Sequence, residues 1–386
     1  MGKTRRLCPF SCGKGPFGNK ARRRHVHKFH GPLPNICDVC KEPFLSERAL
    51  QMHEEDKHSG TSHRAHEPFK VERHPIPIAD LYLVEDLDVT IANVIQPDKK
   101  FLSKTRRAVD KLVKLIQHNL PTELTAARVF KGGSLGKGTA VKGKSDIDLI
   151  VMMSNISEVS DLTSKMPKIL QEMETSLQTF AGVSVVGNSK HSVQITFNGL
   201  SVDILPTLNV KNKRSLKRLY RNMTDPHSLH TKEFYSATLC QLQTALVGAV
   251  PTKVKSLILL IKYWNKEKVK PVVLSRTPTS YVYEIIILDR WVKADKPKLF
   301  DMRRAAHDVL TALVHHKDLQ VLTAGLAKYS KDTAQIRHDT YIMDPCNPTN
   351  DLYNSRNWNW DGVASEAKCW LKSSVFDGVS GTTGHW

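Results

Sequence analysis

A pair of aspartates at the end of a glycine-rich stretch is the strongest chemical signal in the sequence. Gly132–Val151 is GGSLGKGTAVKGKSDIDLIV and closes on Asp146-x-Asp148 inside an apolar run. The length and branched residues of this run predict a buried strand, on which side chains two apart share a face. The two carboxylates would then repel each other, unless divalent cations bind between them. Mg²⁺ takes oxygen ligands and shares them with substrate phosphates, so the stretch predicts metal-dependent phosphoryl or nucleotidyl transfer.

A third aspartate, Asp203, lies in another predicted strand. Ser192–Phe197 alternates apolar and polar residues, an Asn-Gly pair signals a hairpin turn, and Leu200–Leu205 returns as LSVDIL. A lone buried aspartate is rare unless it is paired or bound to metal. If the strands join one sheet, Asp203 lies near the first two aspartates, and three carboxylates can hold two metals and activate a hydroxyl.

The glycine loop does not match the better-known phosphate motifs. A P-loop requires Gly-Lys followed by Ser or Thr, whereas Gly136-Lys137 is followed by Gly138. The dinucleotide fingerprint also fails, because the carboxylates follow on a strand rather than a helix. There remains a Gly-Ser turn, Gly133-Ser134, whose backbone N–H groups would cradle phosphates beside the aspartates.

The charge of the chain favours a polyanionic partner. Its 386 residues have room for two or three domains, and Lys+Arg 57 minus Asp+Glu 38 gives +19. There is no eighteen-residue apolar run, signal-peptide pattern or myristoylation match. We therefore expect an intracellular protein, cytoplasmic with a nuclear location also open, that binds nucleic acid rather than a membrane.

Residues 1–58 carry the ligand spacing of Cys2His2 zinc fingers. Cys37-x2-Cys40 is followed after twelve residues by His53-x4-His58, with two apolar residues between the pairs. Such a short ββα unit cannot bury enough surface alone, so zinc supplies its folding free energy. The alternative is chance spacing.

The same Cys2His2 spacing occurs once more upstream, where the apolar residues between the ligand pairs fit the zinc-finger pattern less well. Its predicted ligands are Cys8, Cys12, His25 and His30, with His27 as an alternative to His25. Its helix would present Arg22, Arg23 and Arg24 to a phosphate backbone; a nuclear-import patch or a solvated face is the alternative. The second finger is acidic, and we expect it to be structural or to bind an unidentified protein. We thus predict one or two structural Zn²⁺.

The segment after the fingers separates them from a larger body. Residues 59–80 are rich in Gly, Ser, Pro and His without periodicity, and we interpret them as a linker. Leu102–Leu120 repeats apolar residues at helical spacing and carries basic ones between them, among them Lys104 and Arg107. This helix is either simply solvated or follows a duplex backbone.

The body resembles the nucleotidyltransferase superfamily, and within it the 2'-5'-oligoadenylate synthetases. The resemblance rests on the Gly-Gly-Ser turn with its paired aspartates and on the longer GGSLGKGTAVKGKSDIDL. Further matches are Pro251–Leu257 with Trp264, Tyr281 with Glu284, Asp344–Thr349, and the tail through Trp370. It covers roughly residues 92–375.

The resemblance implies an α+β fold of two lobes behind the small ββα fingers. The catalytic lobe, with a mixed sheet, would span 81–225, and a helical lobe 226–386. It further implies that duplex RNA activates the enzyme, and that ATP is joined to the 2'-hydroxyl of an acceptor adenosine with release of pyrophosphate.

The site residues follow from the same resemblance. Asp146, Asp148 and Asp203 would bind two Mg²⁺, with Asp203 also helping to deprotonate the 2'-hydroxyl. Gly133, Ser134 and Lys253 would hold the donor triphosphate, and Tyr281 would stack on the adenine. Lys137, at the lip of the loop, would contact the RNA and couple its binding to closure of the site. Core packing of Tyr281 and solvation of Lys253 are the alternatives.

Two departures from the family affect these expectations. Ser280 stands where a glutamine commonly precedes the stacking tyrosine, which leaves donor-base selectivity open. Ser236–Val250 has no charge, whereas vertebrate synthetases have basic RNA contacts in the matching helix. Our hypothesis is that RNA capture has moved partly to residues 1–58, with basic residues of the body contributing, among them Lys213, Arg214 and Lys217.

Two other functions compete with this one. A cyclic-dinucleotide synthase of the cyclic GMP-AMP type shares the fold, but its vertebrate form has a zinc module in the helical lobe, where no Cys/His cluster occurs in this sequence. The second is an inactive, zinc-fingered RNA-binding protein with a nucleotidyltransferase-like domain, although an inactive scaffold has no need of three buried carboxylates.

Deleting residues 1–75 tests where RNA is captured. We expect the deletion to weaken binding of duplex RNA and to flatten its salt dependence, because the basic finger contributes phosphate contacts. Titration of labelled duplex at several salt concentrations measures both. Unchanged affinity and slope would contradict the hypothesis.

Overall fold

The chain divides into two units, Met1–Glu67 and Pro68–Trp386. The computed structural model describes residues 35–36, 43–44, 81–121, 124–142, 147–210, 213–224, 232–323, 325–379 and 386. In the first unit, β1 (Asn35–Ile36) and β2 (Pro43–Phe44) form an antiparallel pair whose connection contains Cys37 and Cys40. The predicted zinc ligands, the Arg22–Arg24 run and the linker 59–80 lie outside the described residues, so these remain predictions.

A five-stranded mixed sheet forms the centre of the first lobe of the second unit. Its order is β3-β4-β7-β6-β5, with β4 and β7 parallel and the other neighbours antiparallel. The hairpin predicted between β6 and β7 is present, with Asn198 and Gly199 at φ 49° and 81°, as a two-residue turn of this kind requires. The strands are β3 (Ala126–Lys131), β4 (Ile147–Met153), β5 (Val183–Asn188), β6 (Val193–Phe197) and β7 (Leu200–Leu208).

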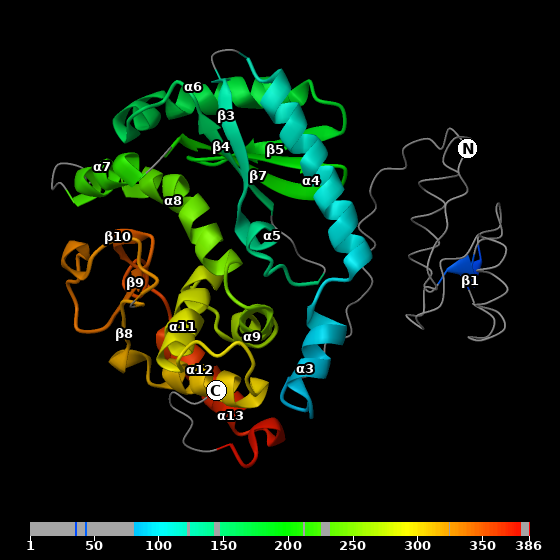
Figure 1. Ribbon diagram of the computed structural model, residues 1–386, viewed down its shortest axis with the longest axis vertical. Coiled ribbons are helices and arrows are strands. Elements are labelled where there is room, and N and C mark those ends of the chain that lie inside the picture. Colours follow the sequence, from blue (N-terminus) through cyan, green and yellow to red (C-terminus); the bar gives the residue numbers. More distant parts are fainter. Residues whose placement is uncertain are drawn as a thin grey trace, which may run out of the picture. The chain divides into compact units, whose positions relative to one another are not determined.

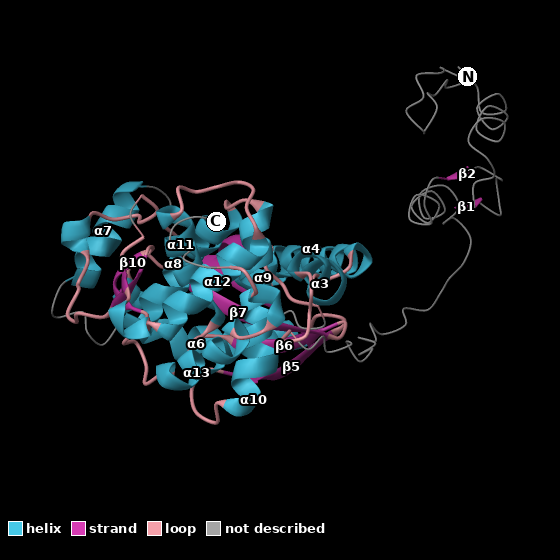
Figure 2. Ribbon diagram, turned by 90° about the horizontal axis from the view of Figure 1, so that it is seen from below, coloured by secondary structure: helices cyan, strands magenta, loops and turns pink. Residues whose placement is uncertain are grey.

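Helices accompany this sheet in the first lobe (Figures 1 and 2). The longest begins after Asp98, whose carboxylate accepts from the Phe101 N–H at 2.6 Å, and it buries Val109, Leu112 and Ile116 at helical spacing. The helices are α4 (Lys99–Asn119), α5 (Gly133–Lys137), α6 (Val159–Gln178), α7 (Lys213–Thr224) and α8 (Lys232–Gly248).

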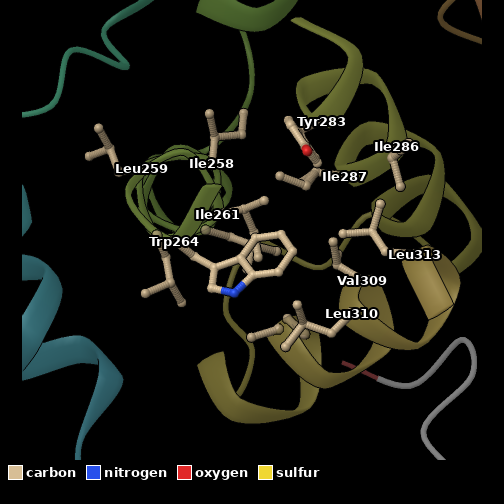
Figure 3. Close-up of a cluster of buried hydrophobic side chains, with 14 of the residues drawn as sticks. Ile258, Leu259, Ile261, Trp264, Tyr283, Ile286, Ile287, Val309, Leu310 and Leu313 are labelled. Carbon is tan, nitrogen blue, oxygen red and sulfur yellow. The ribbon is translucent and has the colours of Figure 1, made fainter. Parts of the chain in front are cut away.

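The second lobe is largely helical. Its helices are α9 (Thr252–Trp264), which continues through a π-helical turn (Asn265–Val269) into α10 (Lys270–Val272), then α11 (Ser280–Lys293), α12 (Met302–Val314) and α13 (Trp360–Leu371). A small sheet joins β8 (Gln320–Val321), β9 (Tyr341–Asp344) and β10 (Asn347–Asp351). Figure 3 shows the core of this lobe, where Trp264 lies among aliphatic side chains of α9, α11 and α12.

The two lobes have separate hydrophobic cores, and the beginning of the second unit belongs to the helical one. Leu81, Leu87, Ile91 and Ile95 are buried in the helical core, from α3 (Leu87–Thr90) and the π-helical turn after it (Ile91–Ile95). The Trp370 indole donates to the Leu81 carbonyl at 3.0 Å. This segment, assigned by sequence to the catalytic lobe, therefore packs on the other one.

Among the described residues, no single helix combines the length and hydropathy needed to cross a membrane. The pair Phe234–Gly248 and Thr252–Val272, bent by 114°, meets the criterion by length and composition only.

Trp370 is expected to be a major contributor to stability. It is fully buried and stacks on Trp264 with ring centroids 5.9 Å apart. Trp370→Ala leaves a cavity and removes this stacking, so the free energy of unfolding should fall by about 3–5 kcal/mol. Urea unfolding measures it. Leu274→Ala, at a side chain 97% exposed, is the control and should change little.

Candidate active site

Two of the three predicted aspartates lie directly opposite each other. Asp148 on β4 pairs in register with Asp203 on the parallel strand β7. Both side chains are half-buried, and their strand neighbours Ile147, Leu149 and Ile204 are at most 1% exposed. In-register residues of adjacent strands project to the same face. The expected juxtaposition of Asp203 with Asp148 is therefore present, while Asp146 lies outside the described residues.

The glycine turn is attached to the aspartate strand by its backbone. The Gly132 N–H donates to the Asp148 carbonyl at 2.7 Å, and α5 follows at once with no side chain capping its first N–H groups. A Cβ at Gly136 would lie 2.2 Å from the Lys131 carbonyl oxygen, so only glycine fits there. Gly133 and Ser134 thus begin a tight turn next to Asp148, as a phosphate-binding turn would need.

Cys240 of α8 lies beneath this turn, a neighbour that the sequence did not reveal. A Cβ at Gly132 would be 3.2 Å from its Sγ and 3.4 Å from the Asp148 Cβ. Burial raises the pKa of the Cys240 thiol, and the nearby Asp148 carboxylate raises it further. The thiol is therefore a packing group for the turn and stays protonated at neutral pH.

Lys137 points inward from the end of α5. Its ammonium lies 2.7 Å from Glu284 of α11 and 4.5 Å from the centroid of the Tyr281 ring. The side chains of Lys137 and Glu284 are 11% and 1% exposed. The residue expected at the lip of the loop thus forms a shielded ion pair between the lobes.

Lys262 of α9 joins the same cluster and was missed by the sequence analysis. Its Nζ donates to the Thr139 carbonyl at 2.9 Å and lies 3.7 Å from Glu284. Lys253, which the sequence assigned to the phosphates, instead pairs with both carboxylate oxygens of Asp88 at 2.6 and 2.7 Å. Lys253 and Lys262 are nine residues apart, which is about two and a half helical turns. The two side chains therefore point to opposite sides of α9. A single lysine in the apolar run LILLIKYW was the available signal.

Tyr281 is held by a buried carboxylate. Its hydroxyl donates to Asp344 at 2.8 Å, and Asp344 also accepts from the Gln243 amide and from the Cys346 N–H. Burial raises the pKa of Asp344, and these donors oppose the rise. Burial likewise raises the pKa of Tyr281. The ring is partly buried and carries the Lys137 ammonium on one face, so its orientation is fixed before any ligand binds.

Of the predicted RNA-binding residues of the body, Lys137 lies in this cluster, and those on α4 and α7 lie on other helices. Lys104 and Arg107 are exposed on α4, and Lys217 is exposed on α7. Lys213 and Arg214 belong to α7, but their side chains lie outside the described residues. The structure thus groups Asp148, Asp203, the turn, Lys137 and Tyr281 in one region.

Two family models match successive parts of the body. Residues 82–222 match the second messenger oligonucleotide or dinucleotide synthetase domain, and residues 213–386 match the C-terminal domain of 2'-5'-oligoadenylate synthetase 1. Rat 2'-5'-oligoadenylate synthase 2 is 26% identical over 96% of this chain, which spans 56% of that protein's length. The rat inactive 2'-5'-oligoadenylate synthase 1B is 25% identical, with 72% of this chain and 82% of that protein covered.

Solved structures share the fold at lower identity. Escherichia coli CdnC with ATP superposes with a TM-score of 0.54 at 19% identity, covering 74% of this chain and 90% of that one. Cid1 poly(U) polymerase bound to MgATP gives 0.51 at 16% identity, covering 77% and 95%.

These similarities show a nucleotidyltransferase-like fold, with the predicted mixed sheet in one lobe and helices in the other. In sequence, the body is similar to the 2'-5'-oligoadenylate synthetases.

Gly136→Ala tests the packing of the turn. The added Cβ must displace the Lys131 carbonyl, so we expect a loss of about 1–3 kcal/mol in the free energy of unfolding. Thermal unfolding measures the change as a lowered Tm. Gly187→Ala is the matched control, since a Cβ there meets nothing within 4 Å. Equal Tm values for the two variants would contradict the close packing.

Proposed function

We propose that the protein is a duplex-RNA-activated nucleotidyltransferase that makes 2'-5'-linked oligoadenylates from ATP. The observation that carries this proposal is the in-register pair Asp148 and Asp203 beside the Gly133-Ser134 turn. Sequence similarity to oligoadenylate synthases along the body supports the choice of product.

The donor nucleotide would lie between the turn and α11. Backbone N–H groups of Gly133 and Ser134 would hold its phosphates, and Lys262 of α9, which donates to the Thr139 carbonyl, would add a cation. The Tyr281 ring, fixed by Asp344, would stack on the adenine. Lys253 could take part only after leaving Asp88.

The aspartates suit Mg²⁺. Two adjacent carboxylates supply the oxygen donors that this hard ion prefers. Among the described residues there is no cluster of three or more metal-ligating side chains, and Asp146, the proposed third ligand, lies outside them. Bound Mg²⁺ would neutralise phosphate charge and lower the pKa of the attacking hydroxyl.

The residues of the site would position ATP and the acceptor's 2'-hydroxyl, and one of them would accept a proton. Asp203 would accept the proton of the acceptor's 2'-hydroxyl as its oxygen attacks the α-phosphorus of ATP. The bond from the α-phosphorus to the bridging oxygen breaks, and pyrophosphate leaves with that oxygen. The turn and Lys262 would stabilise the negative charge that collects on the leaving phosphates.

Duplex RNA would contact the exposed basic face of α4. This helix spans 21 residues, about 31 Å, and its exposed basic residues include Lys104, Arg107 and Lys111. Its one acid, Asp110, is paired with Lys131. RNA bound here would act on the site through the Lys137–Glu284 pair, which joins α5 to α11. We propose a cytoplasmic location for this activity.

Two other activities have support from particular similarities. The match of residues 82–222 to the second messenger synthetase domain favours a cyclic-dinucleotide synthase. The similarity to an inactive oligoadenylate synthase favours a catalytically silent RNA-binding protein. Incubation with ATP, GTP, Mg²⁺ and long duplex RNA, followed by phosphodiesterase digestion of the products, separates the three. Absence of pyrophosphate release with every ligand would refute the enzyme.

Asp148→Asn should abolish synthesis while leaving RNA affinity nearly unchanged. The variant loses a charged metal ligand. Stabilisation of transition-state charge by a bound metal is worth several kcal/mol, so its loss should lower the rate about 10³-fold. Pyrophosphate release and duplex binding are measured in parallel. Asp339→Asn, at an exposed loop position, is the control and should retain activity. Full activity of Asp148→Asn would contradict the assigned site.

A further inference from the structure

A second concave site lies between α7 and the segment that precedes β9. It is a pocket of about 600 Å³, and none of its lining residues belongs to the aspartate site. Those residues are Lys217, Tyr220, Arg221, Thr224, Ala327, Lys328, Tyr329, Ser330 and Thr333.

The pocket is cationic and contains no carboxylate. Lys217 and Arg221 come from α7 and Lys328 from the opposite wall, and all three are exposed. No ion pair involves any of the three within the described part of the chain, whereas Arg218, also on α7, pairs with Glu158 at 2.6 Å. The remaining polar lining consists of hydroxyl groups. Three cations that face a shared cavity without an acid favour a ligand with several negative charges.

Both walls of the pocket are fixed to the same turn between β9 and β10. From α7, the Tyr220 hydroxyl donates to the Cys346 carbonyl at 3.0 Å. From the other wall, the Tyr329 hydroxyl donates to the Asp344 carbonyl at 2.7 Å, and the Lys328 N–H donates to the Pro345 carbonyl at 2.8 Å. The two walls that carry the cations are therefore held together before a ligand arrives, which lowers the entropic cost of binding.

The shape of the pocket favours a small ligand over duplex RNA. A duplex contacts cations that are spread along an extended face, such as the exposed basic residues of α4. Here the cations come from two segments and line a cavity whose volume lies in the range of small-molecule sites. We propose that this pocket binds the phosphate chain of a nucleotide, at a place separate from the aspartates.

A ligand in this pocket would be linked to the donor site by Asp344. The carbonyl of Asp344 accepts from Tyr329 in the pocket wall, and its carboxylate accepts from Tyr281. The binding itself does not rest on the proposed activity, so it is tested without catalysis.

Lysine labelling of the full-length protein tests the proposal residue by residue. The protein is treated briefly with an amine-acetylating reagent in EDTA, alone or with tripolyphosphate, ATP or long duplex RNA, and analysed by mass spectrometry. At saturating tripolyphosphate or ATP we expect acetylation of Lys217 and Lys328 to slow about tenfold. Lys298, exposed on a loop of the helical lobe, is the internal reference and should be unaffected.

A charge-matched pair of variants provides the second measurement. Lys217→Gln with Arg221→Gln and Lys328→Gln should remove one tripolyphosphate-binding event seen by calorimetry. Lys165→Gln with Lys298→Gln and Lys368→Gln removes the same charge from exposed positions and should retain it. Equal binding by both variants, no protection by either phosphate ligand, or protection by RNA alone would overturn the proposal.

Discussion

A buried carboxylate fixes how the two lobes meet. Glu284 is 1% exposed and lies 2.7 Å from Lys137 of the first lobe and 3.7 Å from Lys262 of the second. Removing such charges from water costs several kcal/mol each unless they are paired. An arrangement that separates α5 from α11 would leave Glu284 without Lys137. The glycine turn is therefore held against the helical lobe while its Gly132 N–H holds it to the aspartate strand.

The parts of the site that local patterns determine were predictable from sequence. A branched apolar run predicted β4, and an Asn-Gly turn between alternating runs predicted the hairpin of β6 and β7. Because β4 and β7 are neighbours in the sheet, Asp203 lies opposite Asp148. The strands and the hairpin need only the period of two of a strand and the geometry of a two-residue turn, whereas the pairing of β4 with β7 was an assumption that the sheet confirms.

Long-range packing was not predictable in the same way. The rotation of α9 about its own axis, as it packs against the first lobe, determines which of its faces meets the glycine loop. That face carries Lys262, whereas Lys253 points to Asp88. No repeat within a helix reveals which of two lysines faces another lobe. Likewise, Leu81 and Leu87 precede the sheet in sequence, yet they are buried in the core of the helical lobe. Such contacts depend on tertiary structure rather than on local propensity.

The packing of α8 explains the missing charge in Ser236–Val250. Leu239 belongs to the core of the first lobe, and Leu246 and Val247 belong to the core of the second. A helix that is apolar on most sides is a buried helix, and only Ser236, Ala245 and Ala249 of this segment are exposed. A lysine or arginine at the six buried positions of this segment would lose its hydration without a partner. Exposed cations of the first lobe lie instead on α4, which carries Lys104, Arg107 and Lys111 at its surface.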